Sequence, residues 1–265
     1  MSNIPNFKSA GCKDCRDLYS LGIDFTMAFQ PIVDSKNKTI FGYEALVRGI
    51  NNEGADSILN QLNDSNKYKF DQAIRVKALD LAKALNLQGM LSINFLPNAV
   101  YRAETCIRAT LEAAAELDFP TNRIMFEVTE AEKVIDHDHL KSIFVEYKKQ
   151  NFTTAIDDFG AGYAGLNLLA DWQPDIIKLD MALTRNIHLD LVRKALVTGI
   201  ILVCRELNIK IIAEGIESLE EFKVLSALGI SLYQGFYFAR PGFECLPEIS
   251  PAVWESIETI SNLVE

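Results

Sequence analysis

Short apolar segments of strand-forming residues alternate with longer helix-like segments along most of this 265-residue chain. The alternation runs without a break from residue 91 to residue 238. Strands that are joined in this way by helices require right-handed crossovers and a parallel sheet. No glycine-rich phosphate loop follows an early strand, which disfavours an open doubly wound sheet. The pattern therefore predicts an α/β fold of the (β/α)₈ TIM-like barrel type.

The predicted barrel begins with a hairpin. The segments 27–34 and 39–48 flank the polar turn 35–38, so we expect the first strand to run antiparallel to the rest. We predict strands at 27–34, 39–48, 91–95, 123–130, 153–160, 175–180, 210–215 and 231–238, and helices at 56–87, 103–117, 137–150, 165–172, 188–207, 219–228 and 247–265. Residues 1–24 are expected to form an N-terminal arm or short helix, and residues 25–265 a single domain.

Most of these strands end on a polar side chain that is an oxygen donor or an ammonium. The residues are Glu44, Asn94, Glu127, Asp157, Asp158, Lys178, Asp180, Glu214 and Gln234. The C-terminal ends of parallel barrel strands meet on one face, where barrel enzymes have their active sites. A crowd of buried carboxylates needs a compensating charge. The pattern indicates a divalent metal site, although a salt-bridge network that stiffens the barrel mouth is the alternative for any single residue.

The kind of ligand predicts the kind of metal. Carboxylate and amide oxygens without Cys or His favour Mg²⁺, Mn²⁺ or Ca²⁺. Asp157 and Asp158 are adjacent, and the Phe159–Gly162 segment offers a turn that brings both into one site. Asp157 then bridges two metals, an arrangement suited to cleaving phosphate esters. Lys178 and Asp180 lie on the same side of one strand, and an ammonium there can hold the attacking water.

The net charge and the length of the apolar stretches argue against nucleic acid and membrane partners. The formal net charge of −10 argues against binding long nucleic acid through a basic surface. No secretory signal is evident, and the longest apolar stretch, 195–204, is far short of the ~20 residues of a membrane span. We therefore expect a cytoplasmic protein with reduced thiols. Cys12 and Cys15 form a lone CxxC pair, for which surface or packing thiols are favoured over a redox or metal role.

Several ordered motifs resemble one family. Glu44-Ala45-Leu46, followed by Val47-Arg48, is similar to the signature of the EAL-domain family, bacterial phosphodiesterases that act on cyclic di-GMP. Family-like motifs also occur, in order, at Gln30-Pro31-Ile32, Ser92-Ile93-Asn94, Phe126-Glu127-Val128-Thr129-Glu130, Asp157-Asp158-Phe159-Gly160, Lys178-Leu179-Asp180, Ala213-Glu214-Gly215-Ile216-Glu217 and Gln234-Gly235-Phe236. The resemblance covers roughly residues 25 to 247.

The resemblance implies a role for each matching residue. Glu44, Asn94, Glu127 and Asp157 would hold one Mg²⁺ or Mn²⁺ ion, and Asp157, Asp158 and Glu214 a second, with Gln234 close by. Lys178 would contact the catalytic water, and the metal ligands Glu44, Asp157 and Glu214 would be catalytic residues with it. Gln30, Leu46, Arg48 and Asp180 would face cyclic di-GMP, while Glu130 and Glu217 would support the site. The implied product is the linear dinucleotide pGpG.

In the loop at 161–165, positions 161, 164 and 165 lack the Thr or Ser that many members carry, which affects loop order and regulation more than metal binding. A homodimer formed near this loop is expected, with regulation through dimerisation, the N-terminal arm or a protein partner. Two rival functions remain open. One is a catalytically silent cyclic di-GMP receptor, which the intact ligand set disfavours, and the other is an unrelated metal-dependent barrel hydrolase.

Overall fold

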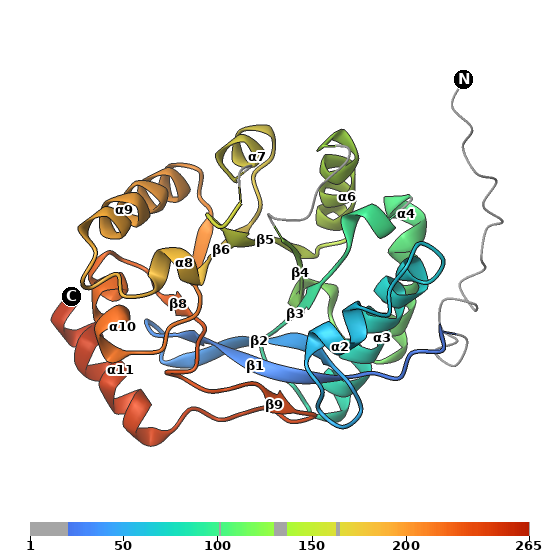
Figure 1. The fold of residues 1–265 in the computed structure, drawn as a ribbon, viewed down its shortest axis with the longest axis horizontal. Helices are drawn as coiled ribbons and strands as arrows, with labels where there is room; N and C mark the ends of the chain where they lie inside the picture. Colours follow the sequence, from blue (N-terminus) through green and yellow to red (C-terminus); the bar gives the residue numbers. More distant parts are fainter. Residues whose placement is uncertain (1–20, 101, 130–136, 163–164, 265) are drawn as a thin grey trace.

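A single closed sheet organises the computed structural model, which describes residues 21–100, 102–129, 137–162 and 165–264. Within these residues the strands are β1 (Thr26–Asp34), β2 (Thr39–Arg48), β3 (Met90–Asn94), β4 (Ile124–Thr129), β5 (Thr153–Phe159), β6 (Ile176–Leu179), β7 (Lys210–Ala213), β8 (Leu232–Tyr233) and β9 (Gly242–Phe243). Strands β2 to β8 pair in parallel in chain order. β1 closes the barrel by pairing antiparallel with both β2 and β8. The predicted barrel and its antiparallel first strand are therefore confirmed (Figure 1).

The barrel interior is built in two layers, one apolar and one polar. The apolar layer consists of Ile32, Met125, Ala155, Ile176, Ile212 and Leu232, all buried. Two positions along the same strands toward the other end of the barrel lie Gln30, Glu127, Asp157, Lys178, Glu214 and Gln234. Because alternate residues of a strand point to the same face, both sets point inward. The apolar layer closes the barrel beneath the polar residues.

Helices surround the barrel (Figure 1). They are α2 (Ala55–Leu59), α3 (Lys67–Ala84), α4 (Ala103–Cys106), α5 (Arg108–Glu116), α6 (His137–Lys149), α7 (Gly165–Asp171), α8 (Met181–Thr184), α9 (Leu191–Glu206), α10 (Leu219–Ala227) and α11 (Pro251–Val264). Their inward faces form the main hydrophobic core against the outer side of the strands. Cys106 and Cys204 are buried there.

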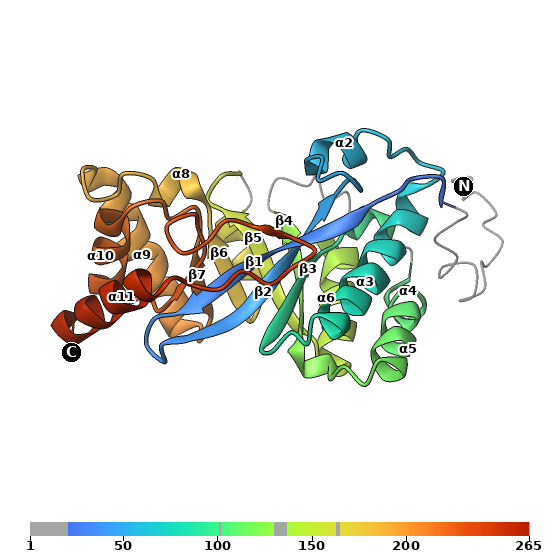
Figure 2. The same cartoon turned by 90° about the horizontal axis from the view of Figure 1, so that it is seen from below.

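Some predicted boundaries were wrong. The segment 56–87 is two helices, because Asn63 and Asn66 bond to nearby backbone groups and form a turn instead of helix. The predicted strand 231–238 is paired only at Leu232–Tyr233, because Gln234 and Gly235 turn the chain back toward Ile216. The sequence also gave no sign of β9, which pairs antiparallel with β1 beside the long hairpin of β1 and β2 (Figure 2).

The predicted helix 188–207 begins at Leu191, where the carboxylate of Asp190 accepts the amides of Val192 and Arg193. No helix in the described part of the chain is long and apolar enough to cross a membrane. The expectation for residues 1–24 falls mostly on residues outside the described ranges and stays a prediction.

Candidate active site

Lys178 is the centre of the polar layer. Its ammonium lies 2.8 Å from Glu127 Oε2, 2.8 Å from Glu214 Oε1, 3.0 Å from Asp157 Oδ1 and 3.4 Å from Glu44 Oε2. Only 1% of the Lys178 side chain is exposed. The four carboxylates come from β2, β4, β5 and the residue after β7, so one lysine on β6 gathers side chains from all around the barrel mouth.

Three amide side chains extend this cluster. Asn94 Nδ2 donates to Glu44 Oε1 at 2.8 Å, and Gln234 Nε2 donates to Glu44 Oε2 at 2.6 Å. Gln234 Nε2 also lies 3.2 Å from Gln30 Oε1, and Gln30 is the antiparallel partner of Glu44 across β1 and β2. Both oxygens of Glu44 are thereby oriented by neutral donors, which leaves the Glu44 charge to be balanced by Lys178 or a cation.

The carboxylates form two overlapping triads. Oxygens of Glu44, Glu127 and Asp157 lie within 4.8 Å of one another, and so do oxygens of Asp157, Asp158 and Glu214. Asp158 adopts a left-handed backbone conformation, with φ of 53°, which turns its side chain toward the same site as its neighbour. Asp157 belongs to both triads.

Unpaired oxygens in the cluster fit hard cations. Glu127 Oε1 and Gln234 Oε1 are buried without a hydrogen-bond partner among the described residues. A buried acceptor without a donor is costly, and a bound divalent ion removes that cost. The donor set of carboxylate and amide oxygens suits Mg²⁺, Mn²⁺ or Ca²⁺.

Burial and crowding shift the acidities of the cluster. Burial, together with the nearby Glu44 and Asp157 charges, raises the pKa of Glu127 to about 8 despite Lys178. Burial, followed by Asp157 and Asp180, raises the pKa of Asp158 to about 6. The pKa of Glu214 is also raised well above its usual value, first by burial and then by Asp157. Burial acts to lower the pKa of Lys178, but the surrounding carboxylates outweigh it and the net shift is upward.

The cluster opens into a cavity of about 270 Å³. Its lining includes Gln30, Glu44, Asp157, Asp158, Lys178, Asp180, Glu214, Glu217 and Gln234. Met181 and Phe236 also line it, with 47% and 45% exposure, although sequence reasoning gave neither a role of its own. Of the aromatic residues that follow the last strand, Phe238 is buried, whereas Phe236 lines the cavity. The guanidinium of Arg240 lies 4.2 Å from the Phe236 ring centroid.

The other predicted residues lie near this cavity or outside the described chain. Leu46 and Arg48 follow Glu44 on the same face of β2 but do not line the cavity, and Arg48 Nη1 donates to the carbonyl of Val47 at 2.7 Å. Asp180 caps α8 by accepting the Ala182 amide at 2.7 Å. Glu217 pairs with Arg185 at 2.7 Å. Glu130 is outside the described residues.

A buried ion pair supports one side of the site. Asp71 and Arg75 are one helical turn apart on α3 and 2.6 Å from each other, with both side chains fully buried. Asp71 Oδ1 accepts the amide of Leu96, two residues after Asn94, and Arg75 Nη1 donates to Tyr147 Oη at 2.8 Å. The guanidinium also lies 4.9 Å from the centroid of Phe126, the neighbour of Glu127. The pair therefore fixes the chain next to two residues of the carboxylate cluster.

The model of the EAL domain matches residues 16–241, which is most of the chain. This chain belongs to the EAL-domain family. It is 33% identical over 224 residues to the blue light- and temperature-regulated antirepressor BluF of Escherichia coli K12, a match that covers 84% of this chain and 56% of BluF. It is 36% identical over 160 residues to the cyclic di-GMP phosphodiesterase PdeR of the same organism, which covers 60% of this chain and 24% of PdeR. This EAL domain thus spans about half of BluF and about a quarter of PdeR.

Solved structures agree with this assignment. A standalone versatile EAL protein from Vibrio cholerae O395, in its c-di-GMP-bound form, superposes with a TM-score of 0.85 and 57% identity, covering 87% of this chain and 98% of that chain. The Klebsiella pneumoniae protein BlrP1, in a complex with manganese and cyclic di-GMP, gives a TM-score of 0.81 and 33% identity, covering 86% of this chain and 58% of BlrP1. The EAL fold is therefore shared with proteins whose structures were solved with this dinucleotide bound.

Proposed function

We propose that this EAL domain is a cyclic di-GMP phosphodiesterase that cleaves one phosphodiester of the ring to give pGpG. The observation that carries the proposal is the pair of carboxylate triads joined at Asp157 around the buried Lys178. A salt-bridge network alone does not account for the unpaired oxygen of Glu127 or for an excess of carboxylates over ammonium groups. Family membership and the titles of the related structures support the same substrate.

Two divalent ions, Mg²⁺ or Mn²⁺, fit the proposed ligand sets of Glu44, Asn94, Glu127 and Asp157, and of Asp157, Asp158 and Glu214, with Gln234 nearby. When bound, such ions lower the pKa of a water molecule and stabilise charge on the phosphate and the leaving oxygen. Lys178 holds the surrounding carboxylates together and orients the attacking water. The amides of Asn94 and Gln234 keep Glu44 in one orientation.

The dinucleotide would lie over the cavity. Gln30 and Asp180 line it, and Leu46 and Arg48 extend the same face of β2 outward from Glu44. A guanidinium suits a phosphate because its planar donors match two phosphate oxygens. Phe236, half exposed at the mouth, offers a flat surface for a guanine base. Glu217 and Glu130 remain supporting residues in this proposal.

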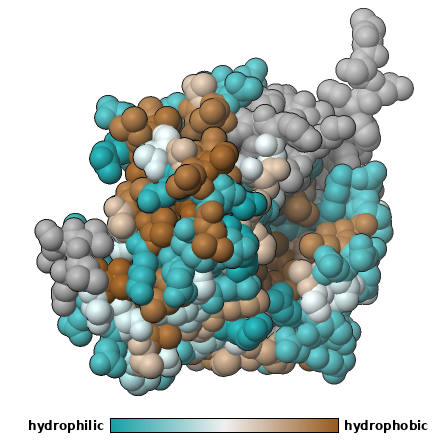
Figure 3. All heavy atoms as spheres, turned by 60° about the vertical axis from the view of Figure 1, so that its left-hand side comes forward, coloured by the Kyte–Doolittle hydropathy of each residue, from teal (hydrophilic) through white to brown (hydrophobic). Residues whose placement is uncertain are grey.

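The proposal includes a homodimer in the cytoplasm. On the outer face of α9, Val192, Leu196 and Val203 follow helical spacing and are exposed, and Leu191 beside them is 84% exposed. Figure 3 shows hydrophobic residues gathered on the side of the molecule that carries α9. Exposed apolar patches of this kind mark protein contacts. Light scattering should give twice the chain mass, and Leu196→Lys should return the monomer mass.

The test of the activity compares Glu44→Ala with Glu255→Ala, an exposed glutamate on α11. The parent chain and both variants are incubated with Mn²⁺ and a panel of cyclic di-GMP, cyclic di-AMP and bis-p-nitrophenyl phosphate. We expect the parent and Glu255→Ala to open cyclic di-GMP preferentially and Glu44→Ala to lose turnover while it stays folded. Binding without cleavage by the parent would indicate a silent receptor, and preference for another ester would indicate an unrelated hydrolase.

A further inference from the structure

A second cavity, of about 380 Å³, lies at the opposite end of the barrel from the carboxylate cluster. Lys210 and Leu232, which line it, are the first residues of β7 and β8, whereas Glu214 and Gln234 come after the last residues of those strands. Asp34, the last residue of the antiparallel β1, also lines it. The apolar layer of the barrel interior separates the two cavities, so a ligand here would not touch the proposed active site.

Two cations line this cavity without a carboxylate partner. Among the described residues, no ion pair involves Lys210 or Arg205. The one carboxylate in the lining, that of Asp34, already accepts the backbone amide and the side-chain amide of Asn37, at 2.9 and 2.8 Å. Acidic residues outnumber basic ones by 36 to 26 in this chain. Lys210 and Arg205 against the one carboxylate of Asp34 leave the lining with a net charge of +1 in an acidic protein, which favours an anion.

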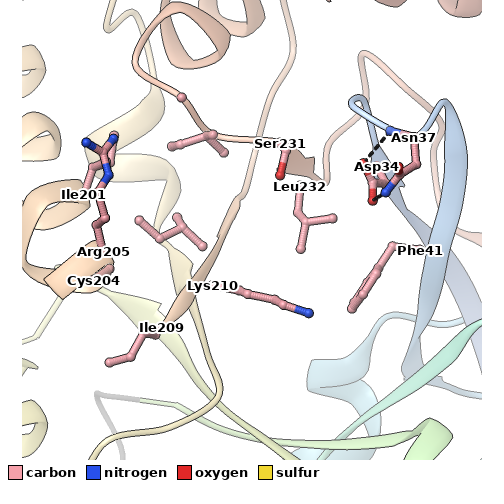
Figure 4. Close-up of a pocket in the computed structure, with 13 residues that line it drawn as sticks. Asp34, Asn37, Phe41, Ile201, Cys204, Arg205, Ile209, Lys210, Ser231 and Leu232 are labelled. Atoms are coloured by element: carbon pink, nitrogen blue, oxygen red, sulfur yellow. Dashed lines mark hydrogen bonds between the residues drawn. The ribbon is translucent and has the colours of Figure 1, made fainter. Parts of the chain in front are cut away.

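The remaining lining is suited to a flat apolar group. Figure 4 shows Lys210 reaching across the pocket toward Phe41, and its ammonium lies 5.9 Å from the ring centroid. Arg205 stands on the α9 side of the same pocket. The lining also includes Ile209, Ile230 and Leu232. The thiol of Cys204, whose pKa burial raises to about 11, adds a further neutral surface.

From this arrangement we infer that the N-terminal end of the barrel binds a small organic phosphate that carries one planar ring, of about the size of a mononucleotide. The acidic group would lie beside Lys210 or Arg205, and the ring would lie against Phe41 and the isoleucine and leucine side chains. A cavity of this volume is at the lower end of the ~300–1,000 Å³ range of small-molecule sites. The inference concerns a site separate from the proposed catalysis and does not depend on it.

The test is calorimetric titration of the full chain in the presence of chelator. The probes are adenosine 5′-monophosphate, inorganic phosphate and adenosine, which separate the ring from the phosphate. We expect the nucleotide to bind at least ten times more tightly than either part. Lys210→Ala and Arg205→Ala should each weaken nucleotide binding several-fold or more, because each removes one of the two cations.

Two control variants make the result specific. Lys194→Ala removes an exposed lysine of α9 that does not line the cavity, and Glu44→Ala alters the carboxylate cluster at the other end. Both should bind the nucleotide like the parent chain. The inference fails if the nucleotide does not bind at millimolar concentration, if phosphate alone binds as tightly, or if Lys210→Ala and Arg205→Ala bind like the parent. It also fails if Glu44→Ala abolishes binding, since the ligand would then occupy the carboxylate site.

Discussion

Lys178 and Glu127 form an ion pair of 2.8 Å in which 1% of the lysine side chain and none of the glutamate side chain is exposed. Glu127 is one of four carboxylates around this ammonium, so the pair is part of a cluster with a negative excess. Removing one member of a buried pair leaves a charge without a partner, which is far more costly than removing a surface charge. The stability and the chemistry of the site therefore both depend on Lys178.

Replacement of this lysine tests that dependence. In the presence of chelator, Lys178→Met should lower the free energy of unfolding by about 3–5 kcal/mol. The matched control is Lys38→Met, because Lys38 pairs with Glu258 at 2.7 Å on an exposed surface. An exposed pair contributes only about 0–1 kcal/mol. Urea denaturation measures both, and equal losses for the two variants would contradict a central role for Lys178.

The raised pKa values of the carboxylate cluster predict an unusual dependence of stability on pH. The pKa of Glu127 in the folded chain is about 8, well above its value in the unfolded chain. Between about pH 4.5 and 8 the folded state therefore binds more protons at this residue than the unfolded state does, and stability falls as the pH rises. Each such proton contributes a slope of up to about 1.4 kcal/mol per pH unit.

Denaturant titrations in chelator across this pH range check the prediction. The Glu127→Gln variant should lose the part of the slope that comes from this residue. Added Mn²⁺ should reverse the trend, because cations bind only the deprotonated carboxylates and so stabilise the fold more strongly at higher pH. Stability that rises with pH in chelator, for the parent chain over this window, would contradict the assignment of a raised pKa.

The pair of Asp71 and Arg75 gives a prediction about burial. Asp71→Ala should destabilise the chain by about 3–5 kcal/mol, because Arg75 is left buried without its carboxylate. Asp64 and Lys67 are the same 2.6 Å apart as Asp71 and Arg75, but the Asp64 side chain is 96% exposed. Asp64→Ala should leave stability close to that of the parent chain, because an exposed ion pair contributes little. Thermal and urea denaturation of the two variants separate the effect of burial on stability from the effect of distance. Similar losses of stability in both variants would contradict a cost that depends on burial.

Gly235 predicts a backbone requirement next to the site. A Cβ at this position would lie 2.1 Å from the carbonyl oxygen of Ile216 and 2.3 Å from its nitrogen. Gly235→Ala should therefore displace Gln234, which orients Glu44, and reduce turnover of cyclic di-GMP by tenfold or more. At Gly54, a Cβ would meet no atom within 4 Å, so Gly54→Ala should keep normal turnover. A Gly235→Ala variant with full activity would show that Gln234 orients Glu44 without a glycine at position 235.

The sequence predicted the barrel and its polar layer because both follow from strand periodicity. In Ile176-Ile177-Lys178 and Met125-Phe126-Glu127, the first and third residues face the barrel interior. Because alternate residues of a strand point to the same face, a polar residue two positions after an inward-facing apolar one can be assigned to the interior from the sequence alone. The order of motifs then indicated the family. What the sequence could not predict depends on distant partners. Asp71 and Arg75 have the spacing of an exposed helix pair, and only the packing of Tyr147 and Phe126 around them shows that they are buried.

The end of the last strand was missed for a related reason. A run of strand-forming residues continues past Tyr233, but the hydrogen bonds that end the strand come from Ile216, in a loop that is remote in sequence. That turn exposes Phe236 at the cavity, while Phe238 becomes buried. Local propensity does not report such tertiary contacts.

The most direct test of the central claim is incubation of the purified chain with cyclic di-GMP, in parallel with saturating Mn²⁺ and with excess chelator, followed by chromatography of the nucleotides. We predict conversion to linear pGpG with Mn²⁺ and recovery of the intact ring with chelator. Cyclic di-GMP that stays whole with ample Mn²⁺, in a chain shown to be folded and to bind the metal, would contradict the proposed hydrolysis.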